Sequence, residues 1–314
     1  MALSRKRVTR LFQVKPGSEV RLRDFDPHWA GEGEFKELTR TELKARAQGV
    51  LVKNVEALAS AQENLYAADR HSVLIVLQAM DAAGKDGTIK HVMSGVNPQG
   101  CQVFAFKKPS SEELDHNFLW RYMKSLPERG RIGIFNRSYY EDVLVVRVHP
   151  ELLAAQRLPE GPEGDKFWKQ RYDDINNFER HLVRNGTLIL KFFLNVSKQE
   201  QRQRFIDRLE DPEKQWKFSF ADLAERRHWD EYQSAFEHLL SHTSTPWAPW
   251  WVVPADHKWV TRTLVSAITA NAIAELGDKP PELSEEQRQR LGDARKELGT
   301  GKERPGATRT RRRA

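Results

Sequence analysis

The residues best suited to chemistry lie in one short stretch that follows an apolar run. The run Val73–Gln78 is rich in β-branched residues and leads into a turn of small residues, after which a helix-compatible segment extends to Met93. In such a strand–loop–helix unit, backbone N–H groups can approach an anion, the helix N-terminus adds positive potential and a lysine supplies a cation. The stretch therefore predicts phosphate binding by Ala83, Gly84, Lys85, Asp86, Gly87 and Thr88.

This loop departs from the G-x-x-x-x-G-K-[ST] pattern of phosphate-binding loops. Ala79 stands at the first glycine, and Asp86 replaces the hydroxyl residue that normally holds Mg²⁺. Asp81 lies inside the loop, where its carboxylate would repel a phosphate unless a cation lay between them. We therefore expect Asp81 to bind Mg²⁺, directly or through water. The alternative is an ordinary strand-to-helix turn with a solvated lysine.

A second group of polar residues follows the run Ile132–Phe135. Asn136 stands where the strand beside a phosphate loop usually ends in a magnesium-binding acid, and Arg137 comes directly after it. A guanidinium offers the planar set of donors that a phosphoryl group prefers. We expect Arg137 to stabilise the transferred group and Glu141 to tune which acceptor phosphate is seated. An ion pair between Arg137 and Glu141, four residues later, is the alternative.

Further cations lie in a long helical detour from Lys198 to Leu240, which we interpret as a lid. Arg204 and Arg208 share one helical face, and we expect one of them to meet the transferred phosphate when the lid closes. Acidic residues are almost as frequent here, so a solvated surface helix is the alternative. Lysines that could form a track for a long polyanion are Lys107 and Lys108 after the second predicted strand, and Lys214 and Lys217 in the lid.

The chemistry that these residues support is phosphoryl transfer between phosphates. Such transfer needs no strong base, because the attacking phosphate oxygen is already anionic and catalysis consists of charge neutralisation and in-line positioning. We therefore expect Asp81, Lys85 and Arg137 to be the catalytic residues, with Lys85 and the backbone of the loop holding the donor phosphates.

The elements that must position these residues alternate along the chain. A long helix over Thr39–Asp69 is predicted by leucines that recur every seven residues. The predicted strands are Val73–Gln78, Gln102–Phe106, Ile132–Phe135, Leu188–Leu194 and Trp250–Val253, and the predicted helices between them are Lys85–Met93, Glu112–Ser125, Tyr139–Val148 and Asp165–Arg184. Apolar strands separated by helices indicate an α/β fold, a three-layer sandwich with a central parallel sheet whose ligands bind at the carboxyl ends of the strands.

The chain is expected to have three parts. Residues 1–70 form an N-terminal extension, irregular up to residue 36 and then helical, and residues 71–276 form the core with the lid at about 198–240. Residues 277–314 form a polar basic tail that contains a possible helix, Glu285–Leu298, and is otherwise expected to be disordered.

Charge and composition exclude several classes of protein. The net charge is +7, but its excess lies in the two ends of the chain, which argues against nucleic acid as the ligand. We expect no membrane span, because the apolar runs have the length of strands, and no signal peptide, because the basic start lacks an apolar stretch. The single cysteine, Cys101, fits a cytoplasmic protein.

Together these motifs resemble the polyphosphate kinase 2 family, a branch of P-loop kinases related to thymidylate kinase. The resemblance covers roughly residues 20 to 275 and runs through Met80–Ile89, Phe135–Val148, Arg204–Ser219, Ser244–Trp250 and Pro254–Asp256. Asn136 and the run Leu144–Arg147 look like those of the family's third class.

The resemblance implies a P-loop kinase-like core with a helical lid and an N-terminal helical extension. It implies reversible transfer of a phosphoryl group between inorganic polyphosphate and AMP or ADP, or GMP or GDP, to make ADP or ATP and their guanine counterparts. It also implies Mg²⁺ as cofactor and a homo-oligomer, dimer or tetramer, for which the helix over Thr39–Asp69 is a candidate contact.

Two alternatives remain. The first is an ATP-dependent nucleotide or small-molecule kinase of the same fold, against which the replacement of the usual Ser or Thr by Asp86 counts. The second is a nucleic-acid-binding protein that uses the basic ends and the aromatic run Trp247–Trp251. The pattern of Trp250–Val253 favours a core strand instead, which leaves no exposed stacking platform there.

Overall fold

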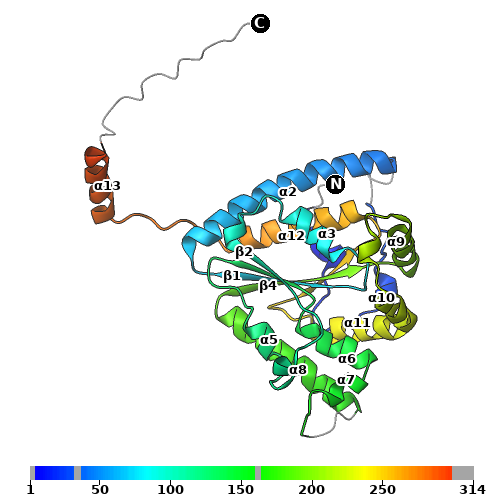
Figure 1. Cartoon of the computed structure of the whole chain (residues 1–314). Helices are drawn as coiled ribbons and strands as arrows, with labels where there is room; N and C mark the ends of the chain where they lie inside the picture. The colour runs from blue at the N-terminus through cyan, green and yellow to red at the C-terminus, as the bar shows by residue number, and fades with distance from the viewer. Residues whose placement is uncertain (1–3, 32–36, 160–163, 299–314) are drawn as a thin grey trace. The chain divides into compact units, whose positions relative to one another are not determined.

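The structure is a computed structural model that describes residues 4–31, 37–159 and 164–298 (Figure 1). The chain divides into two compact units, Met1–Lys279 and Pro280–Ala314. In the second unit the predicted helix is present as α13 (Glu285–Glu297), whose first turn is closed by a capping box between Ser284 and Gln287. The predicted disorder of the last residues falls on 299–314, outside the described residues.

Within the described part of the first unit, five strands form one parallel sheet in the order β2-β3-β1-β4-β5. The strands are β1 (Ser72–Gln78), β2 (Cys101–Ala105), β3 (Ile132–Asn136), β4 (Thr187–Asn195) and β5 (Trp250–Pro254). Each agrees with its predicted range to within one residue at either end. The agreement follows from burial, because a strand covered on both faces, such as fully buried β1, is a continuous apolar run.

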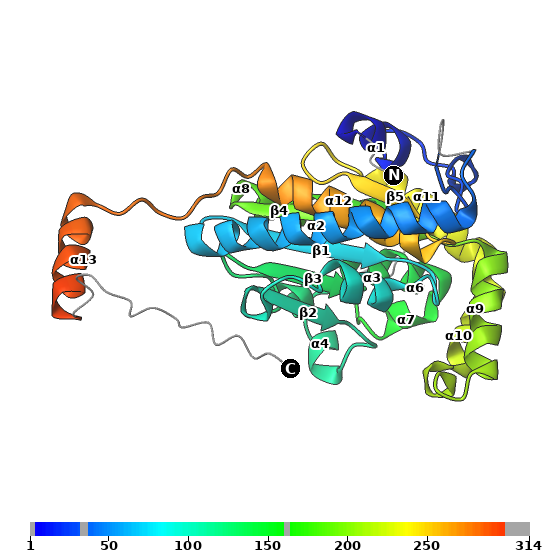
Figure 2. The same ribbon diagram turned by 90° about the horizontal axis from the view of Figure 1, so that it is seen from above.

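Helices cover both faces of the sheet, as predicted (Figure 1). On one side of the sheet lie α3 (Lys85–Val92) and α12 (Lys258–Ala274), and α2 (Arg40–Ala68) packs on α12. The other face carries α5 (Trp120–Met123), α6 (Val145–Val148), α7 (Glu151–Ala154), α8 (Gly164–Arg184) and α11 (Trp229–Thr243). Figure 2 shows α9 (Lys198–Glu210) and α10 (Phe220–Glu225) beyond the carboxyl ends of the strands. The α/β three-layer architecture is confirmed.

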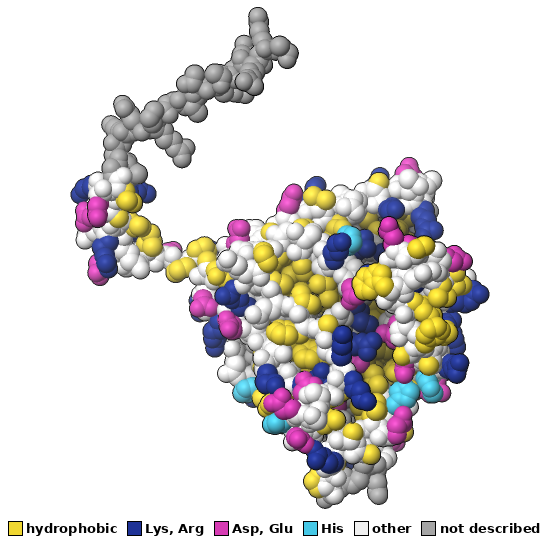
Figure 3. Space-filling model, viewed as in Figure 1, with side chains coloured by type: hydrophobic (Ala, Val, Ile, Leu, Met, Phe, Trp, Pro, Cys, Tyr) yellow, Lys and Arg dark blue, Asp and Glu magenta, His cyan; other side chains and the backbone are white. Residues whose placement is uncertain are grey.

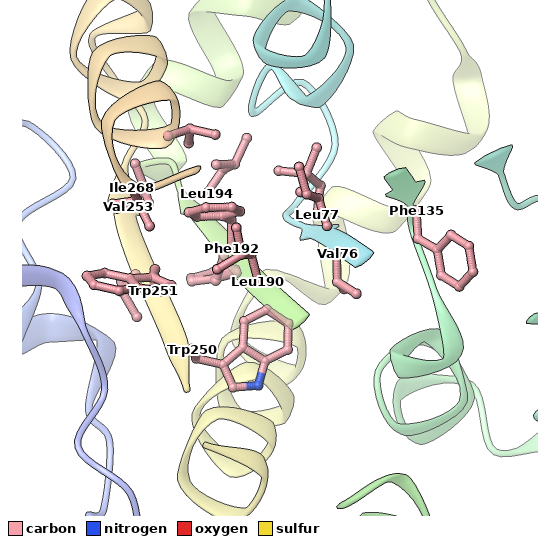
Figure 4. Close-up of a cluster of buried hydrophobic side chains, with 14 of the residues drawn as sticks. Val76, Leu77, Phe135, Leu190, Phe192, Leu194, Trp250, Trp251, Val253 and Ile268 are labelled. Atoms are coloured by element: carbon pink, nitrogen blue, oxygen red, sulfur yellow. The ribbon is translucent and has the colours of Figure 1, made fainter. Parts of the chain in front are cut away.

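The core lies between the sheet and its helices. Figure 4 shows side chains of β1, β3, β4 and β5 packed together with Ile268 of α12. Helix α2 packs along α12 (Figure 2), and the amide of Asn54 donates to the Thr263 carbonyl at 3.2 Å and to Ser266 Oγ at 3.0 Å. The long helix thus covers α12 rather than the sheet itself. Among the helices that the structure describes, none has the length and apolar character that a membrane crossing requires.

Several predicted elements need correction. Residues 1–36 are not wholly irregular, because α1 (Arg5–Phe12) buries Val8 and Phe12, and the Phe12 ring meets Trp29 edge-on at 5.0 Å. The predicted helix Glu112–Ser125 consists of two short helices, α4 (Ser111–Leu114) and α5. The predicted helix Tyr139–Val148 is a 3-10 helix, Tyr139–Val143, followed by α6. Helix α12 was not predicted, because buried residues on most of its circumference leave no polar face to mark it.

Candidate active site

The loop between β1 and α3 has the backbone conformation of a phosphate-binding turn. Gly84 has φ 106°, a conformation that other residues rarely adopt, and it is the N-terminal cap of α3. Ala82 is also left-handed, with φ 61°, although it carries a side chain. The chain therefore turns sharply just before Lys85, which begins α3, where the N–H groups of the first turn have no acceptor within the helix.

The ammonium of Lys85 lies over this loop. Its Nζ donates to the Ala79 carbonyl at 3.0 Å. Burial lowers the pKa of Lys85, while the carboxylate of Asp81 opposes that shift. Lys85 and Asp81, the two loop residues predicted to be catalytic, are thus close enough to influence each other electrostatically.

Arg137 links the loop to the end of β3. Its Nη2 donates to Asp81 Oδ1 at 2.7 Å, and its Nη1 lies 3.7 Å from Glu141 Oε2. Burial lowers the pKa of Arg137, but Glu141 and Asp81 outweigh this effect and raise it. Burial raises the pKa of Glu141, against the opposing charges of Arg137 and Lys85. Two carboxylates therefore fix the guanidinium in place, and the ion pair with Glu141 coexists with a position in the site.

Asn136 is bonded to the residue that replaces the usual loop hydroxyl. Its Nδ2 donates to Asp86 Oδ1 at 2.7 Å. The last residue of β3 thereby orients the first acidic side chain of α3.

The two candidate lid arginines occupy different environments. Arg204 is only 5% exposed, and its guanidinium donates to the Ala82 and Ala83 carbonyls at 2.9 and 2.7 Å and to the Ala255 carbonyl at 2.6 Å. Its Nε donates to Glu200 Oε1 at 2.8 Å. Arg208 lies one turn further along α9, with its Nη1 3.8 Å from Asp222 Oδ2. Arg204 therefore stabilises the loop through hydrogen bonds to its carbonyls, whereas the guanidinium of Arg208 has a long ion pair with Asp222.

A buried charge network lies behind Arg137. Lys191 of β4 is fully buried, and its Nζ lies 2.6 Å from Glu179 Oε2 and donates to the Thr243 carbonyl at 2.7 Å. The hydroxyls of Tyr139 and Tyr140 donate to Glu179 Oε1 at 2.8 and 2.7 Å. Burial lowers the pKa of Lys191, and Glu179 opposes the shift. The network anchors the 3-10 helix Tyr139–Val143, which begins two residues after Arg137, to β4, α8 and α11.

These residues surround a cavity of about 750 Å³, which we name the active-site cavity. Of the predicted site residues, Glu141 alone does not line it. The others do so: Asp81, Ala83, Gly84, Lys85, Asp86, Gly87, Thr88, Lys107, Lys108, Asn136, Arg137, Arg204, Arg208, Lys214 and Lys217. Figure 3 shows Lys and Arg side chains gathered around a hollow between α3 and the α9–α10 region.

Several residues of this cavity were not predicted from the sequence. Lys258, Thr261 and Arg262 come from the start of α12, and Asp207, Trp216 and Asp222 come from the region of α9 and α10. A signal for the first group was available, since Lys258 and Arg262 are four residues apart after the fifth predicted strand, whose end lies at the same sheet edge.

The acidic residues of the cavity fit a hard cation bound together with a phosphate ligand. Burial, followed by the charge of Asp81, raises the pKa of Asp222. Across the described residues there is no group of three or more His, Cys, Asp or Glu side chains that could enclose a metal. Mg²⁺ commonly uses one or two carboxylates and completes its shell with substrate phosphates and water, so Asp81 is an adequate protein ligand.

A family model described as "Polyphosphate kinase 2 (PPK2)" matches residues 42–280. The chain belongs to this family. It is 50% identical over 295 residues to the ADP-polyphosphate phosphotransferase of Rhodopseudomonas palustris, covering 92% of this chain and 98% of the relative. It is 46% identical over 271 residues to the AMP/ADP-polyphosphate phosphotransferase of Meiothermus ruber, covering 86% of this chain and 95% of the relative.

The fold of this polyphosphate kinase 2 is similar to a solved structure of the same family. The crystal structure of polyphosphate kinase 2 from Arthrobacter aurescens TC1 matches with a TM-score of 0.78 and 38% identity, covering 90% of this chain and 95% of the other. The family, the P-loop kinase-like fold and the enzyme class of a polyphosphate-dependent phosphotransferase, each predicted from the sequence, are confirmed.

Proposed function

We propose that this polyphosphate kinase 2 transfers phosphoryl groups reversibly between inorganic polyphosphate and both AMP and ADP, with guanine nucleotides as further acceptors. The observation that carries the proposal is the convergence of the Lys85 loop, Arg137 and a ring of lysines and arginines on one cavity. Relatives named for ADP, for AMP/ADP and for GDP support the choice of nucleotides. Asn136 and the run Leu144–Arg147 support the acceptance of both AMP and ADP, as in the third class.

The residues around the cavity suit a transfer in which an anionic oxygen of the acceptor attacks a terminal phosphorus of the donor. The new P–O bond forms as the bond to the rest of the chain breaks, and the shortened polyphosphate leaves with the electron pair. Lys85 and the loop N–H groups hold the donor phosphates, and Arg137 stabilises the phosphoryl group between donor and acceptor. Asp81 and Glu141 hold the guanidinium of Arg137 in place, so little reorganisation is needed at the moment of transfer.

Asp81 is also the proposed ligand of Mg²⁺. When bound, the metal supplies positive charge to the donor and acceptor phosphates. Asp81 Oδ1 accepts a hydrogen bond from Arg137, and Asp81 also lines the cavity. Its carboxylate can therefore bind the metal while it holds Arg137.

Among the two lid arginines, we propose that Arg208 approaches the substrate. The guanidinium of Arg204 is already bonded to loop carbonyls and to Glu200, whereas that of Arg208 has a 3.8 Å ion pair with Asp222 and lies 5.7 Å from the centre of the Phe205 ring. Of the predicted lid Lys198–Leu240, we propose that α9 and α10 move over the site, because α11 buries Phe236, Leu239 and Leu240 in the core. The proposed track for polyphosphate consists of Lys107, Lys108, Lys214 and Lys217.

We further propose that the chain forms a dimer or tetramer in the cytoplasm. Family resemblance and the single cysteine, Cys101, support this proposal. Multi-angle light scattering of the purified protein measures the mass of the particle, and a monomer at micromolar concentration would contradict it.

The decisive experiment incubates the purified protein with Mg²⁺, polyphosphate and either AMP or ADP, and then separates the nucleotides. We expect AMP to become ADP and then ATP without any other donor. ATP in place of polyphosphate, with candidate small-molecule acceptors, is the matched comparison. If AMP and ADP remain unchanged while ATP phosphorylates another molecule, the ordinary kinase is the better assignment. Conversion of ADP alone would remove AMP from the proposal.

A further inference from the structure

Stability alone does not account for the buried charge network of Lys191, Glu179, Tyr139 and Tyr140. The side chains of Lys191 and Glu179 are fully buried. Taking an ammonium and a carboxylate out of water costs free energy, which their attraction offsets only when the geometry is favourable, and apolar residues of similar volume often serve a core equally well. The network therefore points to a need for a defined geometry rather than for burial.

The network fixes the positions of two tyrosine hydroxyls. Tyr140 Oη donates to Glu179 Oε1 at 2.7 Å and accepts from Lys191 Nζ at 2.9 Å. Tyr139 Oη donates to the same oxygen of Glu179 at 2.8 Å. Apolar contacts have no preferred direction, whereas hydrogen bonds tolerate only a narrow range of distances and angles. The network therefore holds the 3-10 helix Tyr139–Val143 in one position against α8 and β4.

Arg137 lies just before this 3-10 helix and has a strained backbone. Its φ is 66°, in the left-handed region that a residue with a side chain adopts only where the surrounding structure imposes it. Its N–H donates to the Leu77 carbonyl of β1 at 3.1 Å. The next residue, Ser138, is buried, and its Oγ accepts from Gln78 Nε2 at 3.2 Å and from the N–H of Tyr140 at 3.3 Å. The backbone of Arg137 is thus held by β1 on one side and by the 3-10 helix on the other.

The 3-10 helix also carries one of the two carboxylates that hold the guanidinium of Arg137. The N–H of Glu141 donates to the Ser138 carbonyl at 2.9 Å, and Glu141 Oε2 lies 3.7 Å from Arg137 Nη1. A shift of this helix would therefore move the guanidinium both through the backbone and through Glu141. Asp81, the other carboxylate, belongs to the loop after β1 and would not follow the shift. The place of the guanidinium over the phosphate loop consequently depends on where the network holds the helix.

We infer that Glu179, Lys191, Tyr139 and Tyr140 are positioning residues for phosphoryl transfer, which act through Arg137. The inference rests on the proposed function, in which Arg137 stabilises the transferred group. These four residues lie outside the lining of the active-site cavity, so they act without touching the substrate. Their effect is to keep the guanidinium where negative charge develops, so that the transition state is stabilised without reorganisation of the protein.

The test removes single hydroxyl groups from buried tyrosines. Tyr140→Phe deletes two hydrogen bonds of the network and keeps the ring that packs on Trp250 at 4.8 Å. Tyr139→Phe is a second variant, which loses one bond to Glu179. The matched control is Tyr172→Phe, because Tyr172 is a buried tyrosine of α8 whose hydroxyl accepts from Arg147 Nη1 at 2.9 Å, outside the network.

The values of kcat and KM are measured with ADP and polyphosphate, and urea denaturation gives the folded fraction, so that kcat refers to folded protein. In Tyr140→Phe, kcat should fall about tenfold, less than the roughly 10²-fold cost of a full 1 Å displacement. Both KM values should remain close to those of the wild type, because the lost interaction is made in the transition state. In Tyr172→Phe, kcat should equal that of the wild type.

A double-mutant cycle with Arg137→Ala separates positioning from a general structural effect. If the network acts through the guanidinium, then Tyr140→Phe should change kcat by less than about twofold once Arg137 has been replaced. A loss that merely reflects a damaged fold would be the same size in both backgrounds.

Three results would overturn the inference while leaving the proposed function intact. They are an unchanged kcat in both network variants, an equal loss of kcat from Tyr140→Phe with and without Arg137, and a loss of the same size in Tyr172→Phe. Failure of the wild-type protein to phosphorylate ADP or AMP with polyphosphate is a different result, because it would reject the proposed function itself.

Discussion

Replacing Arg204 by alanine should destabilise the protein rather than act only on catalysis. The guanidinium donates to carbonyls of the loop and of the segment after β5, and it pairs with Glu200 on its own helix. Its removal leaves buried carbonyl oxygens without donors and one carboxylate without its partner. Losses of this kind cost about 3–5 kcal/mol. At about 2 °C per kcal/mol for a chain of this size, the melting temperature should fall by about 6–10 °C.

The assay is thermal and urea denaturation with and without polyphosphate, together with kcat measured well below the melting temperature. Arg208→Ala is the matched control, since Arg208 lies one turn along the same helix, and its guanidinium has a 3.8 Å ion pair with Asp222 and lies 5.7 Å from the centre of the Phe205 ring. It should leave the free energy of unfolding nearly unchanged and lower kcat by about 10³-fold, as loss of a transition-state arginine does. If Arg204→Ala melts like the wild type and loses only kcat, the reasoning that Arg204 supports the loop is refuted.

Other perturbations give equally direct tests. Lys85→Ala should abolish transfer with little change in melting temperature, and activity near that of the wild type would show that Lys85 does not contact the donor. Asp81→Asn should remove most activity and weaken the dependence on Mg²⁺, because an amide lacks the charge that a hard cation prefers; an unchanged magnesium titration would place the metal elsewhere. Burial raises the pKa of the Asp142 carboxyl from its ordinary value of about 4 to about 7, so its contribution to stability is complete below pH 4 and is lost as the pH rises through 7. Asp142→Asn should therefore gain stability relative to the wild type as the pH rises from about 4 to 7, by up to about 1.4 kcal/mol per pH unit, and the gain should level off above pH 7; urea midpoints that differ by a constant amount from pH 4 to 7 would contradict it. Deleting residues 285–314 should leave turnover nearly intact, and a large rise in KM confined to long polyphosphate would instead give the arginine-rich end a role in capture.

The strands and the phosphate loop could be predicted because their signals are local. A buried parallel strand is an unbroken apolar run, and the loop follows β1 directly, so Lys85 and its neighbours needed no knowledge of distant contacts. The long helix α2 could also be predicted from local signals, since it begins at a capping box formed by Thr39 and Glu42 and extends to the residue before Asp69.

The environments of the cations could not be predicted in the same way. Arg204 occurs in a charged helix and has the pattern of a surface residue, but the carbonyls that bury it come from segments about 120 and 50 residues away. Lys258 and Arg262 were missed together with α12, whose mostly buried circumference gives no periodic polar face. Sequence spacing indicates which cations share a helix face, but only tertiary packing decides which of them remain available to a ligand.

The buried pair Lys191 and Glu179 also limits how this protein can diverge. Replacing either residue alone leaves the other charge stranded in the core, at a cost of about 3–5 kcal/mol, whereas replacing both with apolar residues of similar size can be neutral. Tyr139 and Tyr140 donate to the same carboxylate, so they too would lose their partner when Glu179 changes. A change from the charged pair to an apolar pair therefore passes through a destabilised protein in which only one of the two residues has been replaced. Lys191 and Glu179 should accordingly be retained together or replaced together.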